Sequence, residues 1–569
     1  MHFLDNFLIG TFTMGSLTDQ NHSYVNVSSY LTRMAIARPY QRAVVYPAGR
    51  DHNGCVAYAH LTFRQLDRES DRLAHGLVKA GLTRGTRTIL MVKPSLEFLV
   101  LVFAMFKCGA VPVVVDPGMG IRRMVGCFKE SRPAAFIGIP LAHVIRTLFP
   151  KNFQTVKTWI TVGRRWFWRG STLRQIRQTP GKRFAAARTR RDEMAAILFT
   201  TGSTGPAKGA IYTHGNFEAQ IHHIRSRFNI EPGEIDLPTF PLYALFDPAL
   251  GMTAVIPDMD PTRPAHVDPR KIIKTIDDHG VTNLPASPAL LHRVGSFGKQ
   301  FGIKLPSLKR VITTGAPISP DNIEQFSSLL VDDAEIHPGY GATEAMPVAS
   351  IGSHEILSDT RPYTDQGYGV CVGRPVARIE VRIIKISDGP IQEWSDDLLV
   401  KEGDVGEITV KGDMVTKQYF EKPLADRLAK IKDNNDIWHR MGDLGWMDTK
   451  GRIWFCGRKS HRVITTYGTL FTIPCESLLN KHPRVFRSAL VGVGPSGRQK
   501  PVICIELHKT DDGKNRAHLE KELLEITAAN ELTKSIKTIL FHKAFPVDIR
   551  HNSKIFREKL ALWAKKKLK

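Results

Sequence analysis

The sequence predicts a large α/β domain followed by a small α+β domain. Its 569 residues exceed what one hydrophobic core usually supports, so we expect at least two domains. Through most of the chain, short apolar runs alternate with segments that carry apolar residues at helical spacing. Strand–helix–strand units with apolar strands are typical of parallel sheets covered by helices. After about residue 375 the pattern changes to short alternating strands separated by Gly and Asp turns.

The first strand–helix–strand unit illustrates the pattern. The segment "LTFRQLDRESDRLAHGLVKAG" (61–81) has apolar residues at helical spacing and ends at Gly81, which predicts a helix. "RTILMVK" (87–93) predicts a buried strand, "SLEFLVLVFAMFKCG" (95–109) a helix, and "AVPVVVDPG" (110–118) another strand. The Arg-rich stretch 181–191 predicts a surface loop before the strand "MAAILFT" (194–200).

The later elements are shorter. "ARIEVRIIKI", "GEITVKG" and "GRIWFCGR" predict alternating strands, and a compact strand–strand–helix–strand–helix pattern follows from "FRSALVGVG" onward. We expect the domain boundary near Arg458, with residues 1–25 as an N-terminal extension, 26–457 as the first domain and 458–569 as the second.

The composition is that of a globular protein, with 42% apolar and 24% charged residues and a mean hydropathy of -0.18. The longest apolar run, Phe98–Phe106, is closed by Lys107 and is too short to span a bilayer. The seven scattered cysteines form no CxxC pair, which predicts reduced thiols of a cytoplasmic protein without structural zinc. No Lys or Arg precedes Arg33, so the first residues lack the basic region of a signal peptide; they predict an extension, or a true start at Met14.

The net charge of +24 would suit nucleic acid, an anionic membrane surface or phosphate-rich ligands. The basic residues are spread along the chain, and no zinc-finger, RNP or basic-zipper pattern accompanies them, so we do not expect nucleic-acid binding. The C-terminal "KLALWAKKKLK" allows peripheral contact with lipid, although a solvated helix explains it more simply.

The stretch "FTTGSTGPAKG" (199–209) has the composition of a phosphate-binding loop. It offers hydroxyl groups, glycines whose backbone N–H groups can turn toward an anion, and a lysine. It does not match the nucleotide-hydrolase P-loop, because Gly209 stands where Ser or Thr should follow the lysine. The loop alone is equally compatible with a flexible linker.

Five further motifs follow in order: "TTGAP" (313–317), "GYGATEA" (339–345), "HRMGDLGWMD" (439–448), "GRIWFCGRKSHRV" (451–463) and "RHNSKIFREKL" (550–560). With the loop, this series resembles the adenylate-forming superfamily, which contains acyl-CoA synthetases, peptide adenylation domains and luciferases. The resemblance runs from about Tyr30 to Leu560. It implies a distorted β-barrel within the first domain, a mobile second domain, and ATP with Mg2+ as cofactors.

The resemblance also implies roles for individual residues. Tyr340, with Gly341 and Ala342, contacts adenine, and the strand end at Gly315, Ala316 and Pro317 lies against the same ring. The β- and γ-phosphates lie against the loop, whose contributing residues are Thr200, Thr201, Gly202, Ser203, Thr204, Gly205 and Lys208.

The resemblance implies further residues that contact the α-phosphate, the magnesium ion and the ribose of ATP. Thr343 touches the α-phosphate and Glu344 binds Mg2+, supplying the oxygen ligand that Gly209 cannot. Asp443 and Arg458 contact the ribose hydroxyls. Lys554 orients the carboxylate and offsets negative charge during adenylation. The hinge between the domains falls at Ser460, where relatives usually carry Asp or Lys. Thr343, Glu344 and Lys554 are thus the expected catalytic residues.

A narrower resemblance concerns the acyl acceptor. "FIGIPLAHV", "DLPTFPLYALFDPALGMTAVIPDMDPTRPA" (236–265) and "FPVDIRHNSKI" are similar to the β-lactone synthetase family of bacterial olefin biosynthesis (OleC). This implies adenylation of a 2-alkyl-3-hydroxy fatty acid and displacement of AMP by its own hydroxyl, with a lactone decarboxylase among the pathway partners. Phe246 and Asp247 are candidates to position that hydroxyl, although a pocket-wall aromatic and a helix-cap carboxylate explain them more simply.

Two alternatives remain open at this point. A long-chain acyl-CoA ligase or acyl-AMP ligase would need a second acceptor, whereas the segment "VITTYG" lacks the lysine that CoA-using relatives carry after the hinge. A non-catalytic basic binding protein on the same scaffold is disfavoured, because Glu344, Asp443, Arg458 and Lys554 are all present.

Overall fold

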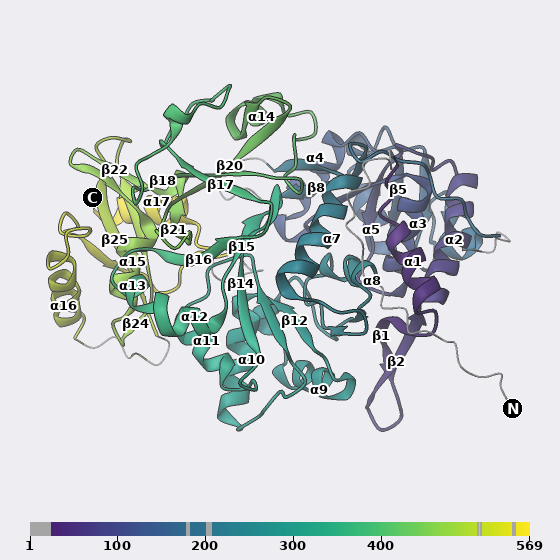
Figure 1. Cartoon of the computed structure of the whole chain (residues 1–569), viewed down its shortest axis with the longest axis horizontal. Helices are drawn as coiled ribbons and strands as arrows, with labels where there is room; N and C mark the ends of the chain where they lie inside the picture. Colours follow the sequence, from purple (N-terminus) through teal and green to yellow (C-terminus); the bar gives the residue numbers. More distant parts are fainter. Residues whose placement is uncertain are drawn as a thin grey trace, which may run out of the picture.

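The computed structural model describes residues 24–177, 182–200, 207–508, 511, 515–548 and 554–568 (Figure 1). A seven-stranded sheet and its helices occupy one end of the molecule, and the C-terminal segment, coloured yellow-green, lies at the other end. The strands of the seven-stranded sheet are β7 (Ser171–Thr172), β6 (Thr158–Thr161), β5 (Ala135–Gly138), β3 (Arg87–Met91), β4 (Val111–Val115), β8 (Met194–Thr200) and β9 (Lys208–Thr213), in that spatial order. All neighbours pair in parallel except β8 and β9, which are antiparallel.

The first predicted unit is confirmed. Helix α2 (Phe63–Lys79) begins at a capping box made by Thr62 and Gln65. Helix α3 (Leu96–Cys108) begins at Ser95, whose side chain accepts from the backbone N–H of Phe98, and ends at Gly109 in the left-handed conformation. Nearly every residue of α3 is buried, which explains why it is apolar on all sides.

The larger sheet has fourteen strands. It contains both the apolar strands typical of parallel sheets and the short alternating strands that follow residue 375. Its central strands β10 to β14 pair in parallel, and its later strands pair as antiparallel neighbours. The strands on the parallel side are β1 (Arg42–Arg50), β2 (Val56–Thr62), β10 (Ile235–Asp236), β11 (Thr253–Val255), β12 (Asn283–Ala286), β13 (Arg310–Thr313) and β14 (Glu335–Ala342). The remaining strands are β15 (Ala345–Ser350), β16 (Val370–Pro375), β17 (Glu380–Ile384), β18 (Gly406–Lys411), β19 (Lys430–Asp433), β20 (Asp436–Met447) and β21 (Ile453–Arg458).

The expected distorted β-barrel is wrong in one respect, because the described strands do not close on themselves. The order β17-β18-β20-β21-β16-β15-β14 is an open path that continues into the parallel strands. Strand β20 pairs with both β18 and β21, while β16 pairs with β15 and β21. The strands predicted from residue 377 onward therefore extend the large sheet.

The C-terminal segment has the predicted α+β pattern. Its three-stranded sheet is built from β24 (Val485–Val493), β25 (Lys500–Leu507) and β26 (Ile539–Phe541), and a hairpin of β22 (Val463–Thr465) and β23 (Gly468–Leu470) precedes it. The helices are α15 (Thr472–Asn480), α16 (Arg516–Ala528) and α17 (Arg557–Lys567). These elements have their own cluster of buried apolar residues. The boundary at Arg458 and the mobility of this segment stay predictions.

The remaining expectations from the sequence concern the cysteines and membrane-spanning helices. All seven cysteines are free thiols, and six of them are buried. Within the described ranges, no helix has both the length and the apolar character needed to cross a bilayer.

Candidate active site

The structure brings Tyr340, Asp443 and Arg458 together. Tyr340 lies on β14, and its hydroxyl donates a hydrogen bond of 2.8 Å to Oδ2 of Asp443. Asp443 on β20 and Arg458 on β21 are direct cross-strand partners, and their side chains form an ion pair of 3.0 Å. Burial raises the pKa of the Asp443 carboxyl, and Arg458 partly opposes that shift. Burial, reinforced by Asp443, raises the pKa of the Tyr340 phenol.

The tight connection between β14 and β15 carries Thr343 and Glu344. It depends on Gly341, since a Cβ there would lie 2.7 Å from the carbonyl oxygen of Ala345. The hydroxyl of Tyr212, on β9, donates to the carbonyl of Thr343. The Glu344 carbonyl accepts from the backbone N–H of Thr416 at 2.8 Å. Thr343 is thus held by strand β9, and Glu344 by the segment that follows β18.

Tyr419 orients the Glu344 carboxylate, and sequence reasoning missed it. Its hydroxyl donates to Oε1 of Glu344 at 2.8 Å, and its backbone bridges Ala210 on β9. Burial, with Glu344 nearby, raises the pKa of this phenol. In the sequence, Tyr419 is simply an aromatic residue that follows a predicted strand. Its contact with Glu344, 75 residues away, was therefore not predictable.

Two lysines lie beside the Tyr419 ring. The Lys208 ammonium is 5.1 Å from the ring centroid and the Lys430 ammonium 5.5 Å, distances at which a cation interacts with an aromatic face. Lys430 is buried and donates to the carbonyl of Thr416. Burial lowers the pKa of Lys430 to about 8, although Glu344 and Asp426 oppose the shift. Lys208 begins β9, directly after the predicted phosphate loop.

The loop residues Thr201, Gly202, Ser203, Thr204 and Gly205 lie outside the described residues. Thr200 ends β8, where its backbone pairs with that of Lys208. Strands β8 and β9, on either side of the loop in the sequence, are antiparallel partners. Helix α7 (His214–Phe228) follows β9 directly.

The predicted adenine wall follows β13. Gly315 has a positive φ of 93°, and Gly315 and Pro317 are exposed while Ala316 is half-buried. The neighbouring Thr314 lies against Gly339 on β14: a Cβ added to that glycine would be 3.2 Å from the Thr314 methyl group. The segment 315–317 therefore continues from the strand adjacent to the one that carries Tyr340, Gly341 and Ala342.

Lys554 lies on the C-terminal segment, where it is exposed. Its carbonyl accepts from the backbone N–H of Asp548 at 2.9 Å, and the adjacent Ile555 bridges Val547. Ser460 lies in the short helical turn η7 (Lys459–His461) after β21, where Lys459 pairs with buried Glu407 at 2.9 Å. The catalytic role of Lys554 and the hinge at Ser460 stay predictions.

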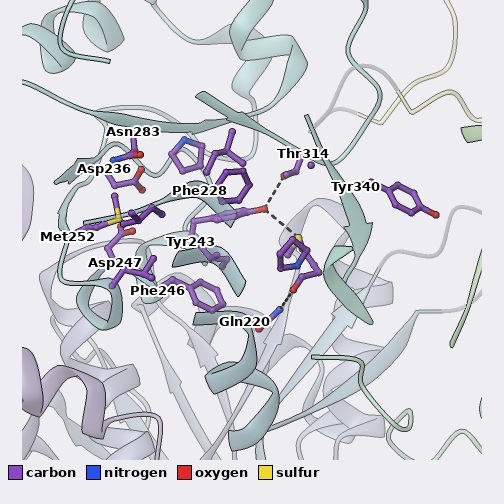
Figure 2. A pocket seen from close by; sticks show the side chains of 18 residues that line it. Gln220, Phe228, Asp236, Tyr243, Phe246, Asp247, Met252, Asn283, Thr314 and Tyr340 are labelled. Carbon is purple, nitrogen blue, oxygen red and sulfur yellow. Dashed lines mark hydrogen bonds between the residues drawn. The ribbon is translucent and has the colours of Figure 1, made fainter. Parts of the chain in front are cut away.

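A largely apolar cavity of about 60 Å³ lies beside the Tyr340 strand (Figure 2). Its walls come from α7, β14, the turn η3 (Tyr243–Leu245) and the short helix α8 (Asp247–Leu250). The Tyr243 hydroxyl lies 3.0 Å from Oγ1 of Thr314, and Gln220 donates to the carbonyl of Met346 at 2.9 Å. The segment 236–265 contributes several of the lining residues, including both candidates Phe246 and Asp247.

Asp247 pairs with a second buried carboxyl that sequence reasoning missed. Asp236 on β10 and Asp247 are 2% and 3% exposed. Burial, with the two carboxyls hydrogen-bonded to each other, raises the pKa of Asp236 well above its ordinary value. Burial likewise raises the pKa of Asp247 from 3.8 to about 8. The pair therefore holds at least one proton at neutral pH, as expected for two adjacent carboxyls in a low-dielectric site.

This pair gives a pH-dependent stability that can be measured. The folded protein holds the proton more tightly than the unfolded chain, so its contribution is greatest below pH 3.8 and is lost as the pH rises toward about 8. The free energy of unfolding, measured with denaturant, should therefore decline less steeply with rising pH in the Asp247→Asn variant than in the wild type between pH 3.8 and about 8. The difference in slope should reach at most about 1.4 kcal/mol per pH unit. The exposed Asp332→Asn substitution is the control. Equal slopes for wild type and Asp247→Asn would contradict the raised pKa of the Asp236–Asp247 pair.

Comparisons with known proteins agree with this architecture. The chain matches the AMP-binding enzyme family over residues 32–420. It is 48% identical over 549 residues to the olefin beta-lactone synthetase of Xanthomonas campestris pv. campestris, covering 95% of this chain and 97% of that protein. It is 47% identical over 551 residues to the olefin beta-lactone synthetase of Stenotrophomonas maltophilia, covering 95% and 98%.

More distant similarities include a sequence relative and a solved structure. A long-chain-fatty-acid–CoA ligase of Mycobacterium tuberculosis is 25% identical over 464 residues, covering 80% of this chain and 84% of that protein. The solved structure of o-succinylbenzoate coenzyme A synthetase from Bacillus subtilis, in complex with ATP and magnesium ion, superposes with a TM-score of 0.71 at 20% identity, covering 93% and 98%. The chain therefore belongs to the AMP-binding enzyme family, together with the olefin β-lactone synthetases.

Proposed function

We propose that this enzyme uses ATP to activate a 2-alkyl-3-hydroxy fatty acid as an acyl-adenylate and then closes it to a β-lactone, releasing diphosphate and AMP. The observation that carries the proposal is the convergence of Tyr340, Asp443 and Arg458 beside the Glu344 turn, at an apolar cavity. Similarity over 95% of the chain to two olefin β-lactone synthetases supports the same reaction.

The nucleotide end of the site is assigned as follows. The Asp443 carboxylate accepts hydrogen bonds from the ribose hydroxyls, and its ion pair with Arg458 favours the charged form against the effect of burial. Tyr340 lies beside adenine together with Gly341, Ala342 and the 315–317 segment. Thr200 and the loop residues 201–205 cradle the phosphates, and Lys208 contributes positive charge to them.

Glu344 suits a magnesium ion bound with ATP. Mg2+ prefers hard oxygen ligands and is often held by one or two carboxylates together with substrate phosphates. Tyr419 fixes the Glu344 carboxylate through one of its oxygens. The ion would offset charge on the phosphates as the reaction proceeds.

The chemistry takes two steps. In the first, a carboxylate oxygen bonds to the α-phosphorus, diphosphate leaves, and Lys554 and Thr343 offset the charge on the reacting oxygens. In the second, the 3-hydroxyl oxygen bonds to the acyl carbon, the bond from that carbon to the phosphate oxygen breaks, and AMP leaves while the hydroxyl proton is released. Because the nucleophile is part of the substrate, it has a high effective concentration and needs no second ligand.

The experiment uses purified full-length protein with Mg-ATP and a 2-alkyl-3-hydroxy acid, with and without CoA. We expect a β-lactone in equal yield in both, with AMP and diphosphate in matching amounts. A thioester that forms only with CoA would instead assign the chain to the acyl-CoA ligases. The same acid without its 3-hydroxyl group is the control, and it should yield no lactone.

The location and pathway follow from the same proposal. The free thiols suit the reducing cytoplasm, and the basic residues Lys565, Lys566 and Lys567 at the end of α17 suit peripheral contact with an anionic membrane. A strained lactone requires a consuming enzyme, and a lactone decarboxylase of olefin biosynthesis is the proposed partner.

A further inference from the structure

We propose that Gln220 is the specificity residue that accepts a hydrogen bond from the 3-hydroxyl group of the acid. This inference rests on the proposed function and extends it to the recognition of the internal nucleophile.

The Gln220 amide has a defined orientation. The residue lies on α7 and is 2% exposed. Its Nε2 donates to the carbonyl of Met346 at 2.9 Å. The Tyr212 phenol, which interacts with the same side chain, donates its own proton to the carbonyl of Thr343. A carbonyl can only accept, so the amide nitrogen faces Met346 and the amide oxygen faces away from it.

The amide oxygen is buried without a donor. Oε1 of Gln220 has no hydrogen-bond partner among the residues that the structure describes, and Gln220 lines the cavity. A buried carbonyl oxygen without a donor costs free energy, which a ligand donor would recover. The oxygen therefore selects for a group that carries a hydrogen, and it gives no attraction to an anion.

Gln220 also lies at the correct end of the cavity. Its partner Met346 is two residues after Glu344, and the Tyr212 hydroxyl donates to the carbonyl of Thr343. The proposed adenylation step brings the acid's carboxyl group to this turn. The 3-hydroxyl is borne two carbons from the carboxyl carbon, so the group that recognises it must lie next to the turn.

The other polar residues that line the cavity are less suitable. Figure 2 shows Asp236 and Asp247 at the end of the cavity opposite Tyr340, with Tyr243 between them. Tyr243 already lies within hydrogen-bonding distance of Thr314. The Asn283 amide is held by Glu234 and Arg310, outside the cavity wall.

The walls near Gln220 suit the rest of such a substrate. Met346, Pro347, Ile224 and Phe246 line the same cavity, and their side chains are apolar. A chain with a hydroxyl at carbon 3 would pair the amide oxygen and keep its alkyl groups on these walls. A chain without the hydroxyl would leave the oxygen unpaired, and such sites discriminate strongly against the analogue that lacks the donor.

The test compares two acids on the same enzyme preparation. We would measure kcat/KM for diphosphate release with a 2-alkyl-3-hydroxy acid and with the matched 3-deoxy acid, in wild type, Gln220→Met and Asp247→Asn. The wild type should prefer the hydroxy acid by roughly 10- to 100-fold. Gln220→Met should reduce this preference to about one, and Asp247→Asn should keep it. A variant that folds poorly lowers both rates equally, so the ratio remains meaningful.

Each outcome decides something. A Gln220→Met enzyme with the wild-type preference would overturn the inference, as would loss of the preference in Asp247→Asn alone. A wild type that makes lactone without discriminating between the two acids during adenylation would overturn it too. A wild type that releases diphosphate but forms no lactone would contradict the proposed function itself, which separates the two failures.

Discussion

Replacing Lys554 with alanine is expected to lower the rate of acyl-adenylate formation by about 10²- to 10³-fold. The reason is electrostatic, because negative charge builds on the carboxylate and α-phosphate oxygens as the bond between them forms. A fixed ammonium group at that point lowers the barrier more than it improves substrate binding. The measurement is acid-dependent exchange of labelled diphosphate into ATP, which follows the first step alone.

Lys559→Ala is the matched control. Lys559 is exposed on α17 and carries the same charge, five positions along the chain from Lys554. Its removal should leave the exchange rate close to that of the wild type. If Lys554→Ala and Lys559→Ala exchange diphosphate equally fast, Lys554 has no role in adenylation.

Glu344→Gln is the second substitution with a large expected effect. It should lower activity by about 10²-fold and shift the magnesium dependence to higher concentrations, since an amide oxygen is a poorer ligand for Mg2+ than a carboxylate. The substitution also changes the acceptor of the Tyr419 hydroxyl. Activity as a function of Mg2+ at saturating ATP measures the effect.

Two further variants separate the binding of Mg2+ by Glu344 from the orientation of the Glu344 carboxylate by Tyr419. Tyr419→Phe keeps the ring beside Lys208 and removes only the hydroxyl, so we expect a loss of about tenfold. Glu421→Gln removes an exposed carboxylate two residues away and is the control for net charge. A Glu344→Gln enzyme with wild-type magnesium dependence would contradict the assignment of Glu344 as the metal ligand.

Much of the fold was predictable from local signals. Apolar spacing together with the caps at Thr62 and Ser95 defines α2 and α3, because these signals lie within the elements themselves. The resemblance to the adenylate-forming superfamily also predicted that Tyr340, Asp443 and Arg458 share one site. Tyr340 and Asp443 lie within β14 and β20, and Arg458 ends β21.

The remaining features depend on contacts between distant segments. Gln220 meets Met346 across 126 residues, and Asp236 meets Asp247 only because β10 packs against the start of α8. No pattern around Gln220 distinguishes it from other polar residues of α7. The distorted barrel that the resemblance implied was wrong for the described strands. Alternation in the sequence could not correct it, because alternation predicts strands and does not specify their partners.

The central claim is that the carboxyl group is activated and the hydroxyl group attacks it, and oxygen labelling tests this directly. The acid would carry ¹⁸O in both carboxyl oxygens and be converted with unlabelled ATP. We predict AMP with one ¹⁸O in its phosphate and a lactone with one ¹⁸O, in its carbonyl group. Unlabelled AMP together with a lactone that retains both ¹⁸O atoms would show activation of the hydroxyl instead, and would contradict the acyl-adenylate.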